Sequence, residues 1–329
     1  MAKDKGDKGR QESDRELRRL EKKIKKEYVQ ALDEMQDQAN KYFAQFEASN
    51  KEKLAAVARG DLTEAQYNEW RRQEMLSGAR YDDMVDNLAE DLTHRNQIAA
   101  RMINKSLPNA YAINNNYAAY QVCQESGKNI SFALVDHATV EKLMKDNPHF
   151  LPQKAGVKYA KDIRWNKRKI RSALTQGILT GESNDKIAAR LRSVADMSEA
   201  ASIRNARTMT TAAENAGRMD RYEESQKMGI KMKKTWVATI DDRTRDSHIL
   251  LDGQTVDIDE PFHSIDGDIM YPGDPDADPA NVYNCRCTMI TQIEGYEHDI
   301  SDRVAGGKLA DNYEDWKEQA EERVRNREK

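Results

Sequence analysis

A long helical stripe near the start of the chain limits most strongly what this sequence can fold into. From residue 17 to residue 46, apolar side chains recur every three or four positions, which is the spacing of one face of an α-helix. The stripe is too narrow to close a core alone, so we expect this helix to pack against one or two partners. Its members are Leu17, Leu20, Ile24, Tyr28, Ala31, Met35, Ala39, Tyr42 and Phe46.

Turn and capping signals predict further helices. Arg59-Gly60 ends the first helix, and Thr63 with Gln66 forms a capping box that opens the second, which Leu107-Pro108 should end. Ser183 and Ser198 are predicted N-caps of two more helices, the second of which ends before Gly229. The other expected elements are a helix at 109–126, a strand or extended crossing at 130–135, a short helix at 138–145 stopped by Asn147-Pro148, a loop at 148–157, and a basic helix ended by Thr180-Gly181.

After Gly229 the pattern changes to short strands and turns. Residues 234–240 have the β-branched and aromatic content of a strand. Asp252-Gly253 is a hairpin signal. The remaining expected elements are a short helix at 243–250, a polar loop at about 261–281, a second strand at 282–293 that contains Cys-Arg-Cys, and a charged helix at 311–329 anchored by Tyr313 and Trp316.

We therefore predict an α+β fold, in which a long-helix N-terminal region is followed by a small mixed domain with a short antiparallel sheet. The low content of proline (7) and glycine (16) in 329 residues also favours long helices over an all-β fold. The predicted parts are a disordered tail at 1–13, a helical region at 14–150, a helical lead-in with the basic helix at 151–230, the mixed domain at 231–295 and a charged C-terminal helix at 296–329.

Composition favours a protein without membrane spans or disulfides. The N-terminus MAKDKGDKGR lacks the apolar core of a signal peptide, and no stretch approaches the ~20 apolar residues of a membrane span. The cysteines number 3, too few for a disulfide framework, and a reducing cytoplasm fits them. The formal net charge of −4 combines a basic middle with an acidic C-terminal third. These regions either pair within the chain or offer separate surfaces to separate partners.

The C-terminal motif elements are the most specific part of the sequence. From Trp236 the chain reads WVATIDDRTRDSHILLDGQ, and it continues with Phe262, the loop YPGDP and the segment NCRC. In order and spacing, these elements resemble the Mu F-like minor head proteins of tailed phages, also called phage head morphogenesis proteins. The close match covers about residues 200–293, and Ala206, Arg207, Thr208 and Glu214 are similar to the family's helical lead-in. The matching motif positions are Trp236, Asp241, Asp242, Arg243, Thr244, Arg245, His248, Gly253, Phe262, Pro272, Gly273, Cys285, Arg286 and Cys287.

The resemblance implies a structural role in head morphogenesis rather than an enzyme. It implies a minor capsid protein of a tailed bacteriophage that acts at or near the portal, inside the capsid, in assembly and in DNA packaging or delivery. Its implied partners are the portal and other capsid proteins, with DNA as a further candidate and no membrane. The implied location is the virion, with the host cytoplasm during assembly.

The residues themselves leave the chemistry of the motif open. Cys285 and Cys287 are two positions apart, so on a strand their side chains lie on one face, where they could ligate a zinc ion with His248 as a third ligand. His263 or an aspartate of the polar loop would then be the fourth ligand. One alternative is a pair of buried, reduced thiols beside a buried histidine, with no cofactor. Another is a vicinal redox pair.

Two groups of basic residues each allow more than one interpretation. Arg243 and Arg245, which follow Asp241 and Asp242, either form an internal ion-pair network or hold an anion. The basic helix is a solvated helix face, a DNA contact or a surface that docks on an acidic protein. Its candidate nucleic-acid contacts are Lys158, Lys161, Arg164, Lys167, Arg168, Lys169 and Arg171.

Common catalytic motifs are absent from the sequence. It contains no Gly-x-Ser-x-Gly, no Walker loop, no Gly-x-Gly-x-x-Gly and no His-Glu-x-x-His. The alternative to a structural protein is a metal-dependent or thiol hydrolase built on His248, Cys285 and Cys287. A third class is a nucleic-acid-binding module that uses the basic middle of the chain.

Overall fold

The computed structural model describes residues 6–76, 78–146, 155–180, 182–305 and 308–327. The chain forms two compact units. One, here called the mixed unit, comprises Met1–Glu21, Ile103–Ala155 and Arg204–Lys329. The other, the helical unit, comprises Lys22–Met102 and Gly156–Ile203.

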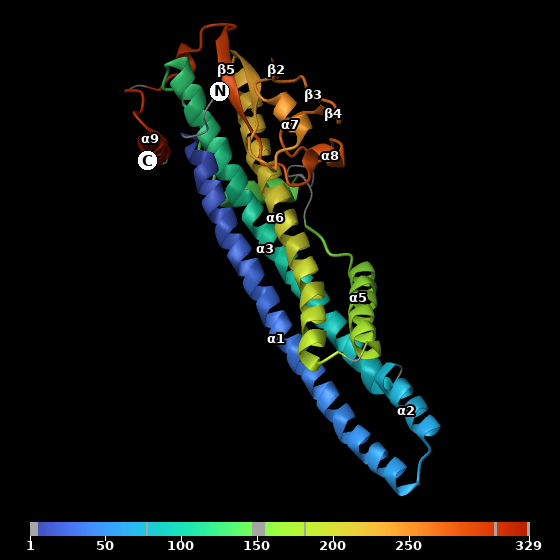
Figure 1. Ribbon diagram of the computed structural model, residues 1–329. Coiled ribbons are helices and arrows are strands. Elements are labelled where there is room, and N and C mark those ends of the chain that lie inside the picture. Colours follow the sequence, from blue (N-terminus) through green and yellow to red (C-terminus); the bar gives the residue numbers. More distant parts are fainter. Residues whose placement is uncertain (1–5, 77, 147–154, 181, 306–307, 328–329) are drawn as a thin grey trace. The chain divides into compact units, whose positions relative to one another are not determined.

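Long helices dominate the described chain, and a small antiparallel sheet lies in its C-terminal part (Figure 1), so the predicted fold class is confirmed. None of the helices within the described ranges is long and apolar enough to cross a membrane. The helices are α1 (Lys8–Arg59), α2 (Glu64–Leu76), α3 (Ala79–Ser126), α4 (His137–Asp146), α5 (Tyr159–Leu179), α6 (Asn184–Lys227), α7 (Asp246–Leu251), α8 (Pro279–Val282) and α9 (Tyr313–Arg327). The strands are β1 (Ile230–Val237), β2 (Thr255–Asp257), β3 (Phe262–Ser264), β4 (Gly267–Ile269) and β5 (Thr288–Tyr296), and a 3₁₀ turn spans Ser301–Arg303.

The apolar stripe of α1 forms the centre of the helical unit. Its predicted members from Ile24 to Phe46 are all buried. Tyr28 is completely buried, and its hydroxyl donates to Asn96 Oδ1 of α3 at 2.6 Å and lies 2.8 Å from Ser202 Oγ of α6. Helix α1 therefore packs against two partner helices in this unit, as the narrow stripe predicts.

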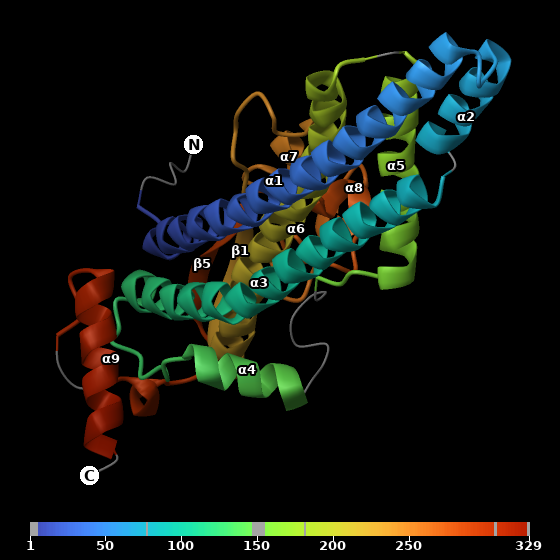
Figure 2. The ribbon, with the colours of Figure 1, turned by 90° about the horizontal axis from the view of Figure 1, so that it is seen from below.

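Helix α5 packs on α3 within the same unit (Figure 2). Asn166 of α5 is fully buried and donates to Thr93 Oγ1 of α3 at 2.8 Å. The hydroxyl of Tyr81 on α3 lies 2.9 Å from Thr175 Oγ1 of α5. These contacts fix which face of α5 points away from α3.

The capping box at the start of α2 is confirmed. The backbone N of Thr63 donates to Gln66 Oε1 at 3.0 Å, and the backbone N of Gln66 donates to Thr63 Oγ1 at 3.3 Å. Before it, α1 ends at Arg59, and Gly60 adopts a left-handed φ of 83°. The local sequence decides this turn, because only short-range hydrogen bonds are needed to form it.

The predicted single helix between Thr63 and Leu107 is wrong. The chain forms α2 and α3 there, and α3 continues through Pro108 to Ser126. A proline inside a helix removes one backbone hydrogen bond. Leu107 and Ala110 are buried on either side of it, and this burial offsets the loss.

Helix α6 is also longer than predicted, because it runs through Ser198 instead of starting anew there. Ser198 is buried, and Leu191, Val194 and Ala195 precede it on the buried side of the helix. Burial of an apolar face outweighs the preference of serine for an N-cap. The other predicted cap, Ser183, does lie directly before α6.

A three-stranded antiparallel sheet in the order β2-β1-β5 is the framework of the mixed unit. Trp236 of β1 pairs with Met289 of β5, so the two strands belong to one short antiparallel sheet, as the predicted fold class requires. Gly253 makes the predicted turn with a φ of 80°, but α7 lies between β1 and β2, so a two-residue hairpin is excluded. The segment 261–281, predicted as a loop, contains the β3–β4 hairpin and the start of α8.

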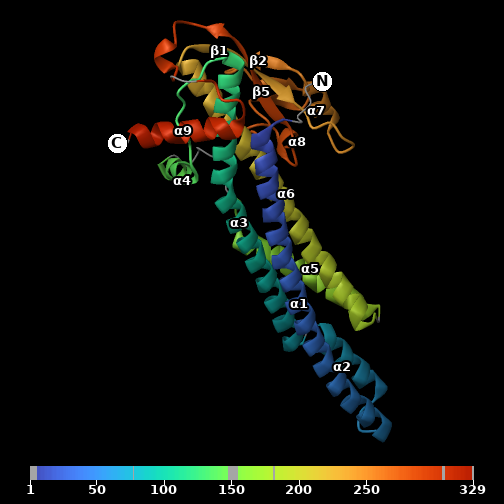
Figure 3. The same cartoon turned by 90° about the vertical axis from the view of Figure 1, so that its left-hand side faces the viewer.

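Aromatic side chains of α9 close the core of the mixed unit. Tyr313 and Trp316 are buried, as predicted for the anchors of this charged helix. The ring of Tyr313 lies 5.2 Å from that of Tyr117, and the ring of Trp316 lies 6.4 Å from that of Tyr120. Helix α9 therefore crosses α3 (Figure 3) and covers one side of the core.

The first described residues are anchored in the mixed unit. Helix α1 begins at Lys8, inside the segment 1–13 that was expected to be a disordered tail, while residues 1–5 lie outside the described residues. Asp7 caps this helix by accepting from the backbone N of Arg10 at 2.9 Å. The charged composition of the segment predicts disorder, but a partner far along the chain overrides it.

That partner is Arg218 of α6, which is completely buried. Its guanidinium donates to Asp7 Oδ2 at 2.6 Å and to Asn114 Oδ1 at 2.8 Å. Asn114 of α3 in turn donates to Ser13 Oγ at 2.7 Å. Two helices of the mixed unit thus hold the first turns of α1 through hydrogen bonds.

We predict that Asp7→Ala lowers the free energy of unfolding by roughly 3–5 kcal/mol, because it leaves the buried Arg218 guanidinium without a carboxylate. Denaturant unfolding of the full chain at neutral pH measures the change. The control is Asp311→Ala, which removes an exposed ion pair with Lys308 and should cost ~0–1 kcal/mol. Equal losses in the two variants would contradict the prediction.

Candidate functional site

The motif residues after β1 form a loop that Asp241 braces. Its carboxylate accepts two hydrogen bonds from Arg286, at 2.5 and 2.6 Å, and one from the backbone N of Arg243 at 3.0 Å. The hydrogen bonds from Arg286, and next the one from the Arg243 backbone, hold the pKa of Asp241 well below its ordinary range. Asp241 is therefore part of an ion-pair network, and its main partner is Arg286. The Arg243 guanidinium lies 3.9 Å from the Asp241 carboxylate, and the Arg243 side chain is 73% exposed.

Helix α7 carries His248 into the interior. Arg245 caps this helix, and its carbonyl accepts from the backbone N of His248 at 3.0 Å. The His248 ring packs edge-on against Trp236, with centroids 5.5 Å apart. Trp236 packs in the same way on Phe262 at 5.2 Å. Three separate elements of the motif thus form one apolar wall that fixes the imidazole ring.

The Cys-Arg-Cys segment lies between α8 and β5, so the prediction that it is part of a strand is wrong. β5 begins only at Thr288, and Asn284 adopts a left-handed φ of 57°. A strand would need an extended backbone at that position. The short helix α8 and the turn after it are set by Asp278, whose side chain accepts from the backbone N of Ala280.

Side chains of α6 form hydrogen bonds with the backbone of this irregular segment. Thr211 Oγ1 donates to the carbonyl of Cys285 at 2.9 Å, and Asn215 Nδ2 donates to the carbonyl of Cys287 at 3.3 Å. Thr208 Oγ1 accepts from the backbone N of residue 284 at 3.0 Å. Positions 208, 211 and 215 lie on one helix face, as their spacing in the sequence shows. The sequence does not show which segment this face contacts.

The side chains predicted as metal ligands meet in the interior of the mixed unit. His248 Nδ1 lies 3.7 Å from Cys285 Sγ and 3.5 Å from Cys287 Sγ, and the three atoms are all within 4.8 Å of one another. All three residues are at most 3% exposed. Cys123 lies elsewhere, with its Sγ 3.6 Å from the carbonyl of Ile130.

The two thiols affect each other's ionisation. The hydrogen bond between their side chains, and next the burial of the group, raise the pKa of Cys285 well above its ordinary value. The same hydrogen bond lowers the pKa of Cys287, to which the contact with His248 also contributes. The backbone N of Cys287 donates to Cys285 Sγ at 3.4 Å. Cys287 is therefore the thiol that ionises first.

A small pocket adjoins this cluster of His248 and the two cysteines. Basic side chains line it, together with two threonines and an asparagine. His248 Nε2 has no hydrogen-bond partner among the described residues. The lining residues besides the cluster are Thr239, Arg243, Thr244, Arg245, Asn284 and Arg286.

His263 does not join the cluster, so its prediction as a fourth ligand is wrong. Its side chain is 67% exposed, and its Nδ1 lies 2.8 Å from Asp268 Oδ1 across the β3–β4 hairpin. Among the described residues, no aspartate of the polar loop lies close enough to His248 and the two cysteines to join the group. In the hairpin His263 contacts Asp268 instead, which the sequence could not show.

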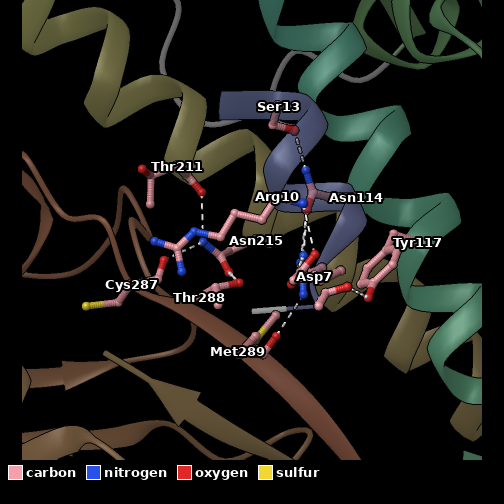
Figure 4. Close-up of polar contacts among 12 residues, drawn as sticks. Asp7, Arg10, Ser13, Asn114, Tyr117, Thr211, Asn215, Cys287, Thr288 and Met289 are labelled. Carbon is pink, nitrogen blue, oxygen red and sulfur yellow. Dashed lines mark hydrogen bonds and ion pairs between the residues drawn. The ribbon is translucent and has the colours of Figure 1, made fainter. Parts of the chain in front are cut away.

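Arg10 contributes to the site from the far end of the sequence and was missed in the sequence-based prediction. Its guanidinium donates to the carbonyl of Arg286 at 2.5 Å and to Thr239 Oγ1 at 2.6 Å. Figure 4 shows this side chain reaching from α1 toward Cys287. No local pattern around Arg10 signals this contact.

Gly273 of the Pro-Gly element is required by close packing. It has a φ of 85°, and a Cβ at this position would lie 2.9 Å from the backbone N of Ala212 in α6. Any other residue would push the loop away from the helix that holds the cysteine segment.

The basic helix lies in the helical unit, where its seven candidate basic residues divide into two groups. Lys167 pairs with Asp86 at 2.8 Å, and Arg171 pairs with Asp82 at 2.7 Å. Lys169 lies over the ring of Trp165 at 5.6 Å. The other four are exposed to solvent, namely Lys158, Lys161, Arg164 and Arg168.

Comparison with known proteins agrees with the motif. Residues 168–290 match the family described as Phage Mu protein F like protein. The minor head protein GP7 of Bacillus phage SPP1 is 28% identical over 280 residues, which are 85% of this chain and 84% of that protein. These matches confirm the resemblance to Mu F-like minor head proteins.

Two bacterial proteins match over shorter stretches. A protein named NAD(+)–arginine ADP-ribosyltransferase EFV, from Enterococcus faecalis, is 28% identical over 207 residues, 60% of this chain and 40% of that protein. An uncharacterized protein of Haemophilus influenzae is 30% identical over 129 residues, 39% of this chain and 26% of that protein. No solved structure matches the chain significantly.

Glu214, in the helical lead-in of the motif, predicts a pH dependence. Burial raises its pKa from 4.5 to about 8, with a smaller contribution from Asp14. The stability that Glu214 contributes is therefore complete below pH ~4.5 and is lost as the pH rises through about 8. The loss amounts to roughly 1.4 kcal/mol for each unit by which folding raises the pKa of Glu214. Between pH 5 and pH 8, the free energy of unfolding of Glu214→Gln should therefore rise relative to that of the wild type. Parallel pH profiles of the two proteins would contradict this prediction.

If the exposed face of α5 binds DNA, binding should depend steeply on salt. Replacing Lys161, Arg164 and Arg168 together by Gln should then reduce the slope of log K against log salt by roughly 0.7–0.9 for each phosphate that the variant no longer neutralises. The matched control replaces Lys167 and Arg171 by Gln, because these residues already pair with carboxylates. Equal slopes for both variants and the wild type would remove α5 as a DNA-binding surface.

Proposed function

With a Mu F-like region at residues 168–290, this chain is a relative of the phage minor head proteins, and we propose that it acts as one of them, as a structural component of a phage head. The observation that carries this proposal is the similarity over 85% of the chain and 84% of the SPP1 protein. That similarity extends well beyond the motif region, so it includes the long helices as well as the mixed unit.

The finer part of the proposal concerns position and partners. We propose that the chain binds the portal and other capsid proteins at the capsid interior and acts in head assembly and in DNA packaging or delivery. Two surface features support it. Helices α1 and α2 present a long charged surface suited to protein contacts, and α5 exposes four basic side chains suited to an acidic partner or to DNA.

A non-enzymatic role also fits the environment of the cysteines. The distances from His248 Nδ1 to the two sulfur atoms would suit a thiol–imidazole pair, but both cysteines are at most 3% exposed and line only a small pocket. A nucleophile needs access to its substrate. The transferase named above matches this chain over 40% of its own length, so the activity in its name does not carry over to this chain.

The proposal predicts that the chain is present in assembled heads of the phage that encodes it. Mass spectrometry of purified full particles, empty heads and assembly intermediates should detect it in all three at low copy number. Deleting its gene should lower the yield of infectious particles, and supplying the protein in trans should restore it. Absence from every particle class would contradict a structural role.

A further inference from the structure

We propose that His248, Cys285 and Cys287 form a zinc site, in which the imidazole Nδ1 and two thiolates bind the ion and a fourth position faces the adjoining pocket. This inference concerns the chain's own residues and does not depend on the proposed role in the phage head. Zinc is the divalent ion whose common ligands are thiolate and imidazole, so the chemistry of the donor set favours it over magnesium or calcium.

The distances match those of a tetrahedral site. A zinc ion bonded to sulfur at about 2.3 Å and to nitrogen at about 2.0–2.1 Å holds the two ligand atoms about 3.5–3.6 Å apart. The observed separations from His248 Nδ1 are 3.7 Å to Cys285 Sγ and 3.5 Å to Cys287 Sγ. Both nitrogen–sulfur separations therefore match those of a zinc site.

The ligands are held in place by contacts that need no metal. Hydrogen bonds from Thr211 and Asn215 fix the backbone of the two cysteines, and packing on Trp236 fixes the His248 ring. A site whose ligands are already oriented loses little conformational entropy on binding. This arrangement distinguishes the three side chains from a chance meeting of mobile residues.

The charge of a zinc ion balances that of two cysteine thiolates. Two thiolates and one zinc ion sum to zero, so the ion removes the cost of burying two negative charges. Buried thiols ionise far more readily when they bind a cation than when no cation is present.

The fourth position has no protein ligand among the described His, Cys, Asp and Glu side chains. The pocket that adjoins the three ligands is lined by Arg243, Arg245 and Arg286. We therefore assign the fourth ligand to an oxygen atom from solvent. The site joins α7 to the segment before β5, so the ion would cross-link two parts of the mixed unit that no disulfide connects.

Metal content of the full-length protein tests this proposal. Protein prepared without chelator should carry one equivalent of zinc, and cobalt added to metal-free, reduced protein should give the thiolate-to-cobalt charge-transfer band. Cys285→Ser, Cys287→Ser and His248→Gln should each abolish zinc retention. The matched control is Cys123→Ser, which removes the other buried cysteine and should keep the full equivalent.

Stability provides a second readout that separates a metal site from a packed thiol pair. A chelator should lower the melting temperature of the wild type and of Cys123→Ser, but should leave that of a folded Cys285→Ser variant unchanged. Circular dichroism identifies which variants are folded. The proposal is overturned if the reduced wild type binds neither zinc nor cobalt, if the metal content is the same in all variants, or if Cys285 and Cys287 are found as a disulfide in the native protein.

Discussion

The hydrogen bonds from α6 to the Cys-Arg-Cys segment are the interaction on which the site depends. A buried backbone outside a strand has no sheet partners, and each buried carbonyl left unpaired costs about 1–3 kcal/mol. Thr211 and Asn215 pair the carbonyls of the two cysteines, and Arg10 pairs the one between them. The irregular backbone that brings both sulfur atoms to His248 is thus stabilised by the helix before the sheet and by the first turns of the chain.

Helix α6 performs this role because its buried face is polar and charged. Arg218 reaches Asp7 and Asn114, while Arg221, also buried, donates to Asn115 Oδ1 at 2.6 Å and to the carbonyl of residue 133 at 3.0 Å. These groups are paired, which makes their burial tolerable. A charged helix face of this kind looks solvent-exposed in a sequence, although here it lies at the centre of a unit.

Most positions of the family motif help to hold the cluster of His248, Cys285 and Cys287 in place. Trp236 forms the wall behind His248, Asp241 holds Arg286, and Gly273 lets a loop approach α6 closely. A motif whose members position one another, with both thiols buried, suits a protein that must keep its shape within an assembly.

The sequence by itself determined the features that rest on local physics. The stripe from Ile24 to Phe46, the capping box at Thr63 and the pairing of the strand after Gly229 with a later one follow from periodicity, short-range hydrogen bonds and strand composition. The set of His248 and the two cysteines was also visible as residue types that share a chemistry.

Only the tertiary structure decided the rest. Burial carries α3 through Pro108 against a local signal, Arg218 orders the segment at Asp7, and α6 shapes a cysteine segment that is not a strand. Each of these outcomes depends on a partner distant along the chain, and such a contact leaves no periodic trace in either segment.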